Sequence, residues 1–193
     1  MLWHSAMSNA QTAVAEPEYR PFPRETGRDG THGGIEVPLM LQLLAVPAGA
    51  RILEIGCGVG ASLAAFDRVA RPRRLVGVDI DAEVIALGRA AARQAGLRCE
   101  LMVADVRALP FAEASFDLVC DFGTAYHIAR RGCALREIAR VLRPGGRFIY
   151  ESRLNQLTSH PVRAWGRTLP FSEAPALVRR RGTLMWAVRE RSR

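Results

Sequence analysis

The sequence predicts an α/β fold, in which a doubly wound and mostly parallel sheet is covered by helices on both faces. Three observations lead to this prediction: strand-like and helix-like segments alternate five times, a glycine-rich turn follows the first buried strand, and acidic residues end several strands. Such alternation is typical of parallel strands joined by crossover helices. Ligands of these sheets bind at the carboxyl ends of the strands, so we expect the acidic residues to gather at one rim.

Apolar periodicity places the elements along the chain. A first helix is expected over residues 36–46, ahead of a buried strand at 51–55. Three more helices are expected at 61–70, 82–95 and 132–142. Four more strands are expected at 74–80, 99–104, 116–121 and 147–152. Asp81 is a predicted N-cap and Gly96 a predicted helix end, and residues 175–191 predict a final antiparallel hairpin.

The length of 193 residues is enough for one domain with a sizeable core. Residues 1–35 are rich in proline, glycine and polar types, which predicts a flexible arm that could serve as a lid, and residues 36–193 are expected to form a single domain. Either Met1 or Met7 could be the first residue. The sequence shows neither an apolar run of the ~20 residues needed to cross a bilayer nor a signal-peptide pattern, so we expect a cytoplasmic location.

The formal net charge of +8 is carried by arginine, since the chain contains no lysine. The arginines are scattered in short runs, which are more typical of solvated faces than of a nucleic-acid footprint. The four cysteines show no metal-binding spacing with any histidine, so we interpret them as reduced core residues and expect no metal site. They are Cys57, Cys99, Cys120 and Cys133.

The glycine-rich turn follows the strand at 51–55. Glycines at positions 56, 58 and 60 allow positive φ angles and leave no Cβ to hold a ligand off the backbone. This spacing also satisfies the dinucleotide fingerprint, so NAD or FAD has to be weighed as a ligand. Glu54 lies two residues before the first glycine, where an acid suits an ammonium or sulfonium better than a pyrophosphate. Asp79 ends the second strand about 20 residues after the last loop glycine, a spacing that places a carboxylate on ribose hydroxyls.

Five motifs over residues 51–150 resemble those of the class I S-adenosylmethionine-dependent methyltransferases, specifically their small-molecule branch. They are, in family order, Leu53-Glu-Ile-Gly-Cys-Gly-Val-Gly60, Val76-Gly-Val-Asp-Ile80, Val103-Ala-Asp-Val106 followed by Leu109-Pro-Phe111, Phe116-Asp-Leu-Val119, and Leu135-Arg-Glu-Ile-Ala-Arg-Val-Leu-Arg-Pro-Gly-Gly146. The resemblance implies a Rossmann-like sheet of seven strands, mostly parallel with an antiparallel last strand. It also implies S-adenosyl-L-methionine as the cofactor.

The resemblance further implies roles for individual residues. Gly56 and Gly58 would lie beside the methionine moiety and Glu54 would support their loop. Asp79 would bind the ribose hydroxyls and Ile80 would cover the adenine face, while Asp105 and the backbone of Val106 would meet the adenine edge. The expected cofactor-binding set is Glu54, Gly56, Cys57, Gly58, Asp79, Ile80, Asp105, Val106, Asp121 and Phe122.

The acceptor side departs from the family pattern, because Tyr126-His127 stands where many relatives have two histidines. His127 could take a proton from the acceptor as a general base, or it could orient the loop after the fourth strand. Asp121 could hold the cofactor ammonium or a cationic acceptor, or it could be satisfied by backbone N–H groups of its own turn. Tyr126 and Trp165 are candidate walls of the acceptor pocket, although such aromatics are as often core residues. Glu151 is expected to be a surface residue of an edge strand.

The function expected from these features is methyl transfer to a small-molecule or lipid-like acceptor by direct displacement. A nucleic-acid methyltransferase is an alternative suggested by the arginines, but the Asn/Asp-Pro-Pro-aromatic motif that holds an exocyclic amino group is missing. A non-catalytic domain that binds S-adenosylmethionine is a second alternative. The expected partner is a small-molecule acceptor rather than nucleic acid, and the chain could form a homodimer.

Overall fold

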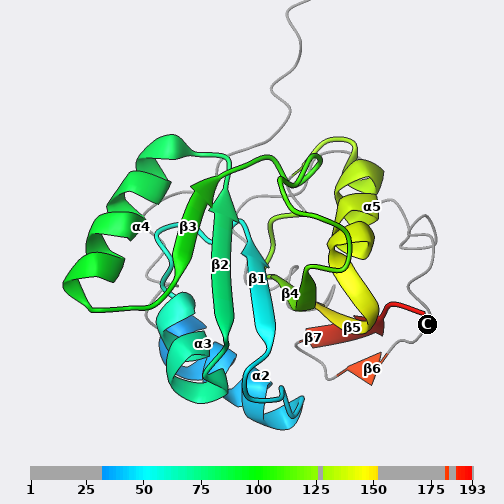
Figure 1. The fold of residues 1–193 in the computed structure, drawn as a ribbon, viewed down its shortest axis with the longest axis horizontal. Helices are drawn as coiled ribbons and strands as arrows, with labels where there is room; N and C mark the ends of the chain where they lie inside the picture. The colour runs from blue at the N-terminus through cyan, green and yellow to red at the C-terminus, as the bar shows by residue number, and fades with distance from the viewer. Residues whose placement is uncertain (1–31, 126–127, 152–180, 183–185, 193) are drawn as a thin grey trace, which may run out of the picture.

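The computed structural model describes residues 32–125, 128–151, 181–182 and 186–192, and these form a sheet flanked by helices (Figure 1). The strands are β1 (Arg51–Ile55), β2 (Arg74–Asp79), β3 (Glu100–Val103), β4 (Phe116–Asp121), β5 (Leu142–Glu151), β6 (Arg181–Gly182) and β7 (Trp186–Glu190). The helices are the π-helical turn η1 (His32–Glu36), α2 (Val37–Leu43), α3 (Leu63–Ala70), α4 (Ala82–Gln94) and α5 (Arg131–Val141).

The strand order is β3-β2-β1-β4-β5-β7-β6, so the chain first runs outward from β1 to β3 and then returns to the other side of β1. Strands β1 to β5 pair in parallel, whereas β7 is antiparallel to β5 and to β6. This confirms the predicted α/β sheet with its reversed last strand. The direction of winding changes between β1 and β4, where Ile55 and Asp121 are register partners. The carboxyl ends of these two strands therefore frame the switch point at which such sheets bind ligands.

The sheet has an apolar core on each face. Successive residues of β1 point to opposite sides, so that Ile52 joins one core and Leu53 the other. The first core includes Met40 of α2 and Phe66 of α3, and the second includes Ile138 of α5. Burial on both sides explains why the strands read as continuous apolar runs in the sequence.

Most element boundaries agree with the sequence analysis. The side chain of Asp81 caps α4 by accepting hydrogen bonds from the backbone N–H groups of Glu83 at 2.9 Å and Val84 at 3.2 Å. Gly96 follows α4 with a φ of 63°. The described residues are already helical at His32, four residues before the expected start. Whether residues 1–35 form a separate arm stays a prediction.

The start of β5 differs from the prediction, because the strand begins at Leu142 and not at Arg147. Leu142 pairs with Phe116, and the register then shifts before Leu118 pairs with Arg147. The proline and glycines between these pairs form an irregular, bulged stretch that the strand accommodates. Gly145 adopts a φ of 72° within it, and its N–H donates to the carbonyl of Arg191 at 2.9 Å.

Cys57 and Cys120 lie in the first core and Cys99 packs against it, as expected, whereas Cys133 is in neither core cluster of the described residues. Cys57 and Cys120 are buried, but Cys99 and Cys133 are half-buried, and all four are free thiols. Among the described residues, no cluster of His, Cys, Asp and Glu has the grouping that a metal ion needs. Within the same part of the chain, the longest apolar helices fall short of what a membrane span requires.

Candidate functional site

The glycine turn after β1 has the backbone conformation that its sequence predicts. Gly56, Gly58 and Gly60 have φ angles of 63°, 56° and 83°, in the left-handed region that other residues rarely adopt. The turn is fixed by backbone bonds from Cys57 N–H to the Val78 carbonyl at 3.0 Å and from Gly60 N–H to the Cys57 carbonyl at 2.9 Å. The Gly60 N–H is therefore used inside the turn, and the helix α3 begins only after it, at Leu63.

Gly56 and Gly58 differ in what surrounds them. A Cβ on Gly56 would overlap the Thr124 hydroxyl and lie 2.6 Å from its Cβ, so this glycine is needed because Thr124 fills the space. Among the described residues, a Cβ on Gly58 would meet no heavy atom within 4 Å. The open backbone face of the turn is therefore at Gly58. Thr124 also donates from its hydroxyl to the carbonyl of Ile55 at 3.1 Å, which ties the loop after β4 to the end of β1.

Glu54 lies beneath the turn, where it is only 3% exposed. The buried hydroxyl of Ser62 donates to its carboxylate and links β1 to the residue that precedes α3. Burial raises the pKa of the Cys57 thiol, and the negative charges of Glu54 and Asp79 raise it further. The Cys57 thiol donates to the Gly58 carbonyl at 3.5 Å, and its sulfur lies where a Cβ on Gly77 would come within 2.8 Å of it. The Cys57 side chain therefore packs against β2 and braces the turn from within.

Asp79 joins the glycine turn to the end of β2. One carboxylate oxygen accepts from the N–H of Gly58 and the other from the N–H of Asp81, each at 3.0 Å. Because a carboxylate oxygen can accept more than one hydrogen bond, both oxygens retain capacity for ligand hydroxyls. Ile80 follows directly and is 39% exposed, which leaves an apolar surface beside this acid.

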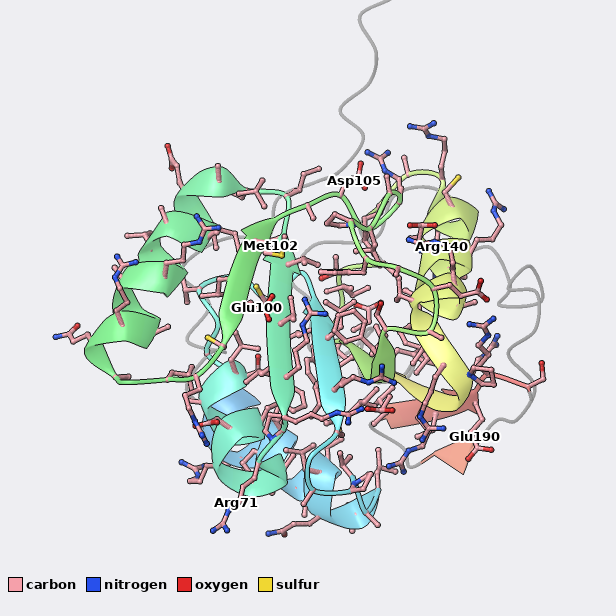
Figure 2. The ribbon with its side chains drawn as sticks, in the orientation of Figure 1. Arg71, Glu100, Met102, Asp105, Arg140 and Glu190 are labelled. Atoms are coloured by element: carbon pink, nitrogen blue, oxygen red, sulfur yellow. The ribbon has the colours of Figure 1, made fainter. Side chains whose placement is uncertain are left out.

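Asp105, after β3, is engaged by Arg107. The carboxylate accepts from the backbone N–H of Arg107 at 2.8 Å and from Nη2 at 2.6 Å. The Arg107 guanidinium holds the pKa of this carboxyl below its usual range, against the opposing effect of burial. Val106 is buried in the core between them, so only its backbone can face a ligand. Figure 2 shows Asp105 beyond the ends of β2 and β3, at the rim opposite to Arg71.

Asp121 is buried and its carboxylate accepts hydrogen bonds from the turn that follows β4. The donors are the N–H groups of Gly123 at 3.0 Å, Thr124 at 2.6 Å and Ala125 at 3.2 Å. Burial raises the pKa of Asp121, while Arg131 and these N–H groups oppose the rise. The geometry thus favours the turn-organising role over direct charge recognition. Phe122 is half-buried and stacks on Phe66 with ring centroids 6.3 Å apart.

The family comparison agrees with this geometry. A family model described as "Methyltransferase domain" matches residues 53–150, half of the chain, which spans the glycine turn and the ends of β2, β3 and β4. The chain belongs to the class I S-adenosylmethionine-dependent methyltransferases.

Two curated relatives illustrate the range of this methyltransferase family. The fatty-acid O-methyltransferase of Mycolicibacterium smegmatis is 35% identical over 127 residues, which cover 66% of this chain and 44% of the relative. The 24-methylenesterol C-methyltransferase 2 of Oryza sativa subsp. japonica is 32% identical over 130 residues, which cover 66% of this chain and 35% of the relative. The chain thus spans less than half the length of both.

Solved structures support the same methyltransferase fold. The YcgJ protein of Bacillus subtilis superposes with a TM-score of 0.56 at 30% identity, covering 59% of this chain and 48% of YcgJ. The PH0226 protein of Pyrococcus horikoshii OT3 superposes with a TM-score of 0.65 and covers 93% of this chain and 97% of its own, but at 22% identity it bears on the fold alone.

The residues expected to bind the cofactor gather at one rim of the sheet. All ten residues expected to bind the cofactor are described, and they lie in or directly beside the carboxyl ends of β1 to β4. Tyr126, His127 and Trp165 lie outside the described residues.

Sequence reasoning missed several residues that shape this rim. Thr124 and Arg107 were not considered, although each lies two or three residues after a strand-ending acid, where backbone N–H groups commonly donate to the acid side chain. Glu151 was expected at the surface, but it is 1% exposed at the end of β5. That prediction was wrong because the strand pairs with β4 on one side and β7 on the other, so Glu151 lies on an interior strand.

Proposed function

We propose that this protein binds S-adenosyl-L-methionine and transfers its methyl group to a small-molecule or lipid-like acceptor. The observation that supports it most is the rim where an open glycine backbone at Gly58 is hydrogen-bonded to Asp79, with Asp105 at the end of the next strand. Asp79 and Asp105, at the ends of neighbouring strands, suit a ligand that carries hydroxyl and amino donors. A pyrophosphate would face the same acids and be repelled, which argues against NAD or FAD.

The residues fit the parts of this cofactor. The turn at Gly56 and Gly58, together with the backbone of Cys57 and the supporting carboxylate of Glu54, would hold the methionine part. The free acceptor capacity of Asp79 suits the ribose hydroxyls, and the exposed side chain of Ile80 suits one face of the adenine. Asp105 and the Val106 backbone would meet the adenine edge. Asp121 and Phe122 would shape the methionine end through the loop after β4.

The bound cofactor would supply a methyl group already activated by its sulfonium. The protein would then contribute mainly by aligning the acceptor and excluding water. His127 is proposed to accept a proton where the acceptor must lose one, with Tyr126 and Trp165 as walls of the acceptor pocket. The hydrogen bond from the Thr124 hydroxyl to the Ile55 carbonyl, which ties the loop after β4 to the end of β1, supports this proposal. The cytoplasmic location and a homodimer stay predictions.

The acceptor class is supported by the relatives, which are named for a fatty acid and a sterol. A radiolabelled methyl-transfer assay with a panel of fatty acids, sterols, quinones and structured RNA tests this directly. We expect label in the lipid-like fraction and none in RNA. Labelling of RNA would favour the nucleic-acid alternative, and tight cofactor binding with no labelled product across the panel would favour a non-catalytic binding domain.

His127→Ala tests the base role in the same assay. We expect product formation to fall by about 10²-fold or more, which is typical for loss of a general base, while cofactor affinity is retained. Full activity of the variant would dispose of the base role and leave His127 as a residue that orients its loop.

A further inference from the structure

The carboxylate of Asp105 is held by a side chain from its own loop. The Nε of Arg107 lies 2.9 Å from Oδ1 and 3.0 Å from Oδ2, and Nη2 lies 2.6 Å from Oδ2. The Arg107 backbone N–H donates to Oδ1 at 2.8 Å. These bonds fix both the plane and the rotation of the carboxylate.

The contact leaves limited room for a ligand. The four contacts come from three N–H groups of Arg107, because the Nε–H is shared between both oxygens. An ionised carboxylate offers about four lone-pair positions, so three donors leave capacity for about one more. The Asp105 side chain is nevertheless 34% exposed, whereas that of Arg107 is only 10% exposed. The remaining acceptor position therefore lies on the side of Asp105 that Arg107 does not cover, open to one further N–H donor.

The loop itself does not depend on this ion pair for its position. Leu109 N–H donates to the carboxylate of Glu137 at 2.8 Å, and Arg140 of α5 donates to the carbonyls of Leu109 at 2.9 Å and Phe111 at 2.6 Å. The side chains of Val106 and Leu109 are buried in the core. The loop after β3 is thus anchored to α5 without the ion pair between Arg107 and Asp105. The main effect of that ion pair is to orient the Asp105 carboxylate.

We propose that Arg107 is a positioning residue that sets the selectivity of the site for adenine over hypoxanthine, which rests on the proposed function. Held by Arg107, the free acceptor position of Asp105 meets the 6-amino group of adenine. Hypoxanthine carries a carbonyl oxygen at that position, so two acceptors would face each other without a proton between them. A guanidinium suits this task because its planar fork meets the two carboxylate oxygens in a fixed geometry, whereas a lysine ammonium is a rotatable point charge that does not fix the carboxylate plane.

The test compares the binding of S-adenosylhomocysteine and S-inosylhomocysteine by calorimetry at pH 7. The wild-type chain should prefer the adenine compound. Arg107→Gln should weaken S-adenosylhomocysteine by about tenfold, the scale of one charge-assisted hydrogen bond, and leave S-inosylhomocysteine within about threefold. Arg107→Lys should fall between the two. Arg98→Gln is the matched control, because it removes the same charge from an exposed side chain on another loop and should change neither affinity.

A double variant separates positioning from structural support. In an Asp105→Asn background, adding Arg107→Gln should cost little more, because the group that Arg107 positions is already altered. Equal losses for both nucleosides, additive losses in the double variant, or tighter binding of the adenine compound by Arg107→Gln would each overturn the proposal. If Arg107→Gln fails to fold, Arg107→Lys and Asp105→Asn decide on the same criteria. A wild-type chain that binds neither nucleoside would contradict the proposed function itself, whereas binding with unchanged selectivity in the variants would contradict only the role of Arg107.

Discussion

Gly56 and Gly58 show how one sequence pattern serves two physical needs. Both have left-handed backbone conformations, but the space beside Gly56 is filled by Thr124 and the space beside Gly58 is open. Gly56 therefore allows the loop after β4 to pack on the glycine turn. Gly58 instead leaves a stretch of backbone that no described residue covers. A glycine-rich motif alone does not separate these roles, because the separation depends on a residue almost 70 positions away.

The Gly56–Thr124 packing predicts a specific coupling in stability. Gly56→Ala should lower the free energy of unfolding by about 1–3 kcal/mol from overpacking, in addition to about 1–2 kcal/mol from the strained φ angle. Gly58→Ala should lose only the second contribution, the one from the strained φ angle. Thr124→Gly removes the clash, so the double variant Gly56→Ala with Thr124→Gly should be more stable than the sum of the single losses implies. Urea unfolding gives the free energy of unfolding of the three single variants and the double variant. Strictly additive losses would show that Thr124 is not the reason why position 56 needs a glycine.

At the scale of elements, ion pairs join strands that are distant in sequence. Asp117 at the start of β4 accepts from Arg51 of β1, through both its backbone N–H at 2.8 Å and its Nε at 3.1 Å, and from Arg143 of β5 at 2.6 Å. Burial alone would raise the pKa of Asp117, but these hydrogen bonds outweigh it and hold the pKa well below the usual range. One carboxylate thus links the amino ends of three adjacent strands.

This arrangement predicts a pH dependence of stability. Because the pKa of Asp117 is lower in the folded chain than in the unfolded chain, its contribution is complete above the unfolded value near 4 and is lost as the pH falls below it. At pH 7, Asp117→Asn should lower the free energy of unfolding by about 1.5–3 kcal/mol, and the difference should shrink towards pH 2. Urea titrations at several pH values measure this.

Glu100→Gln is a suitable control for Asp117. Glu100 pairs with Arg74 at 3.0 Å, but both side chains are well exposed, and such surface pairs contribute at most about 1 kcal/mol. A difference between wild type and Asp117→Asn that stays constant from pH 7 to pH 2 would contradict the proposed role of the carboxylate.

At the scale of the whole molecule, the sequence was sufficient for the order and type of the elements, because buried parallel strands and amphipathic helices have distinct apolar periods. The strand ends that carry Gly58, Asp79 and Asp105 were also predictable, since acids after apolar runs mark the carboxyl rim. The bulged start of β5 was not. Its Pro144 and Gly145 signal a loop locally, whereas the pairing of Leu142 with Phe116 is a long-range interaction that overrides the local signal.

The hydrogen-bond partners of the arginines were equally hard to predict. Charge runs indicated solvated faces, yet several arginines bind backbone carbonyls at element ends. Arg147 donates to the carbonyls of Leu44 and Ala45 after α2, and Arg191 donates to that of Leu142 after α5. Which carbonyl an arginine reaches depends on the tertiary fold. The composition gives the number of arginines but not their hydrogen-bond partners.

The central claim is that the methyl donor binds against the open backbone at Gly58. Calorimetry with S-adenosylhomocysteine on wild type, Gly58→Ala and Gly96→Ala tests it most directly. Gly96 has a comparable φ of 63° and equally open surroundings, but it lies at the far end of α4, so it carries the same backbone cost without facing the site. We predict binding by wild type and Gly96→Ala and a loss of at least about tenfold in Gly58→Ala. Equal affinity of all three proteins, or binding of a nicotinamide or flavin nucleotide in place of S-adenosylhomocysteine, would contradict the claim.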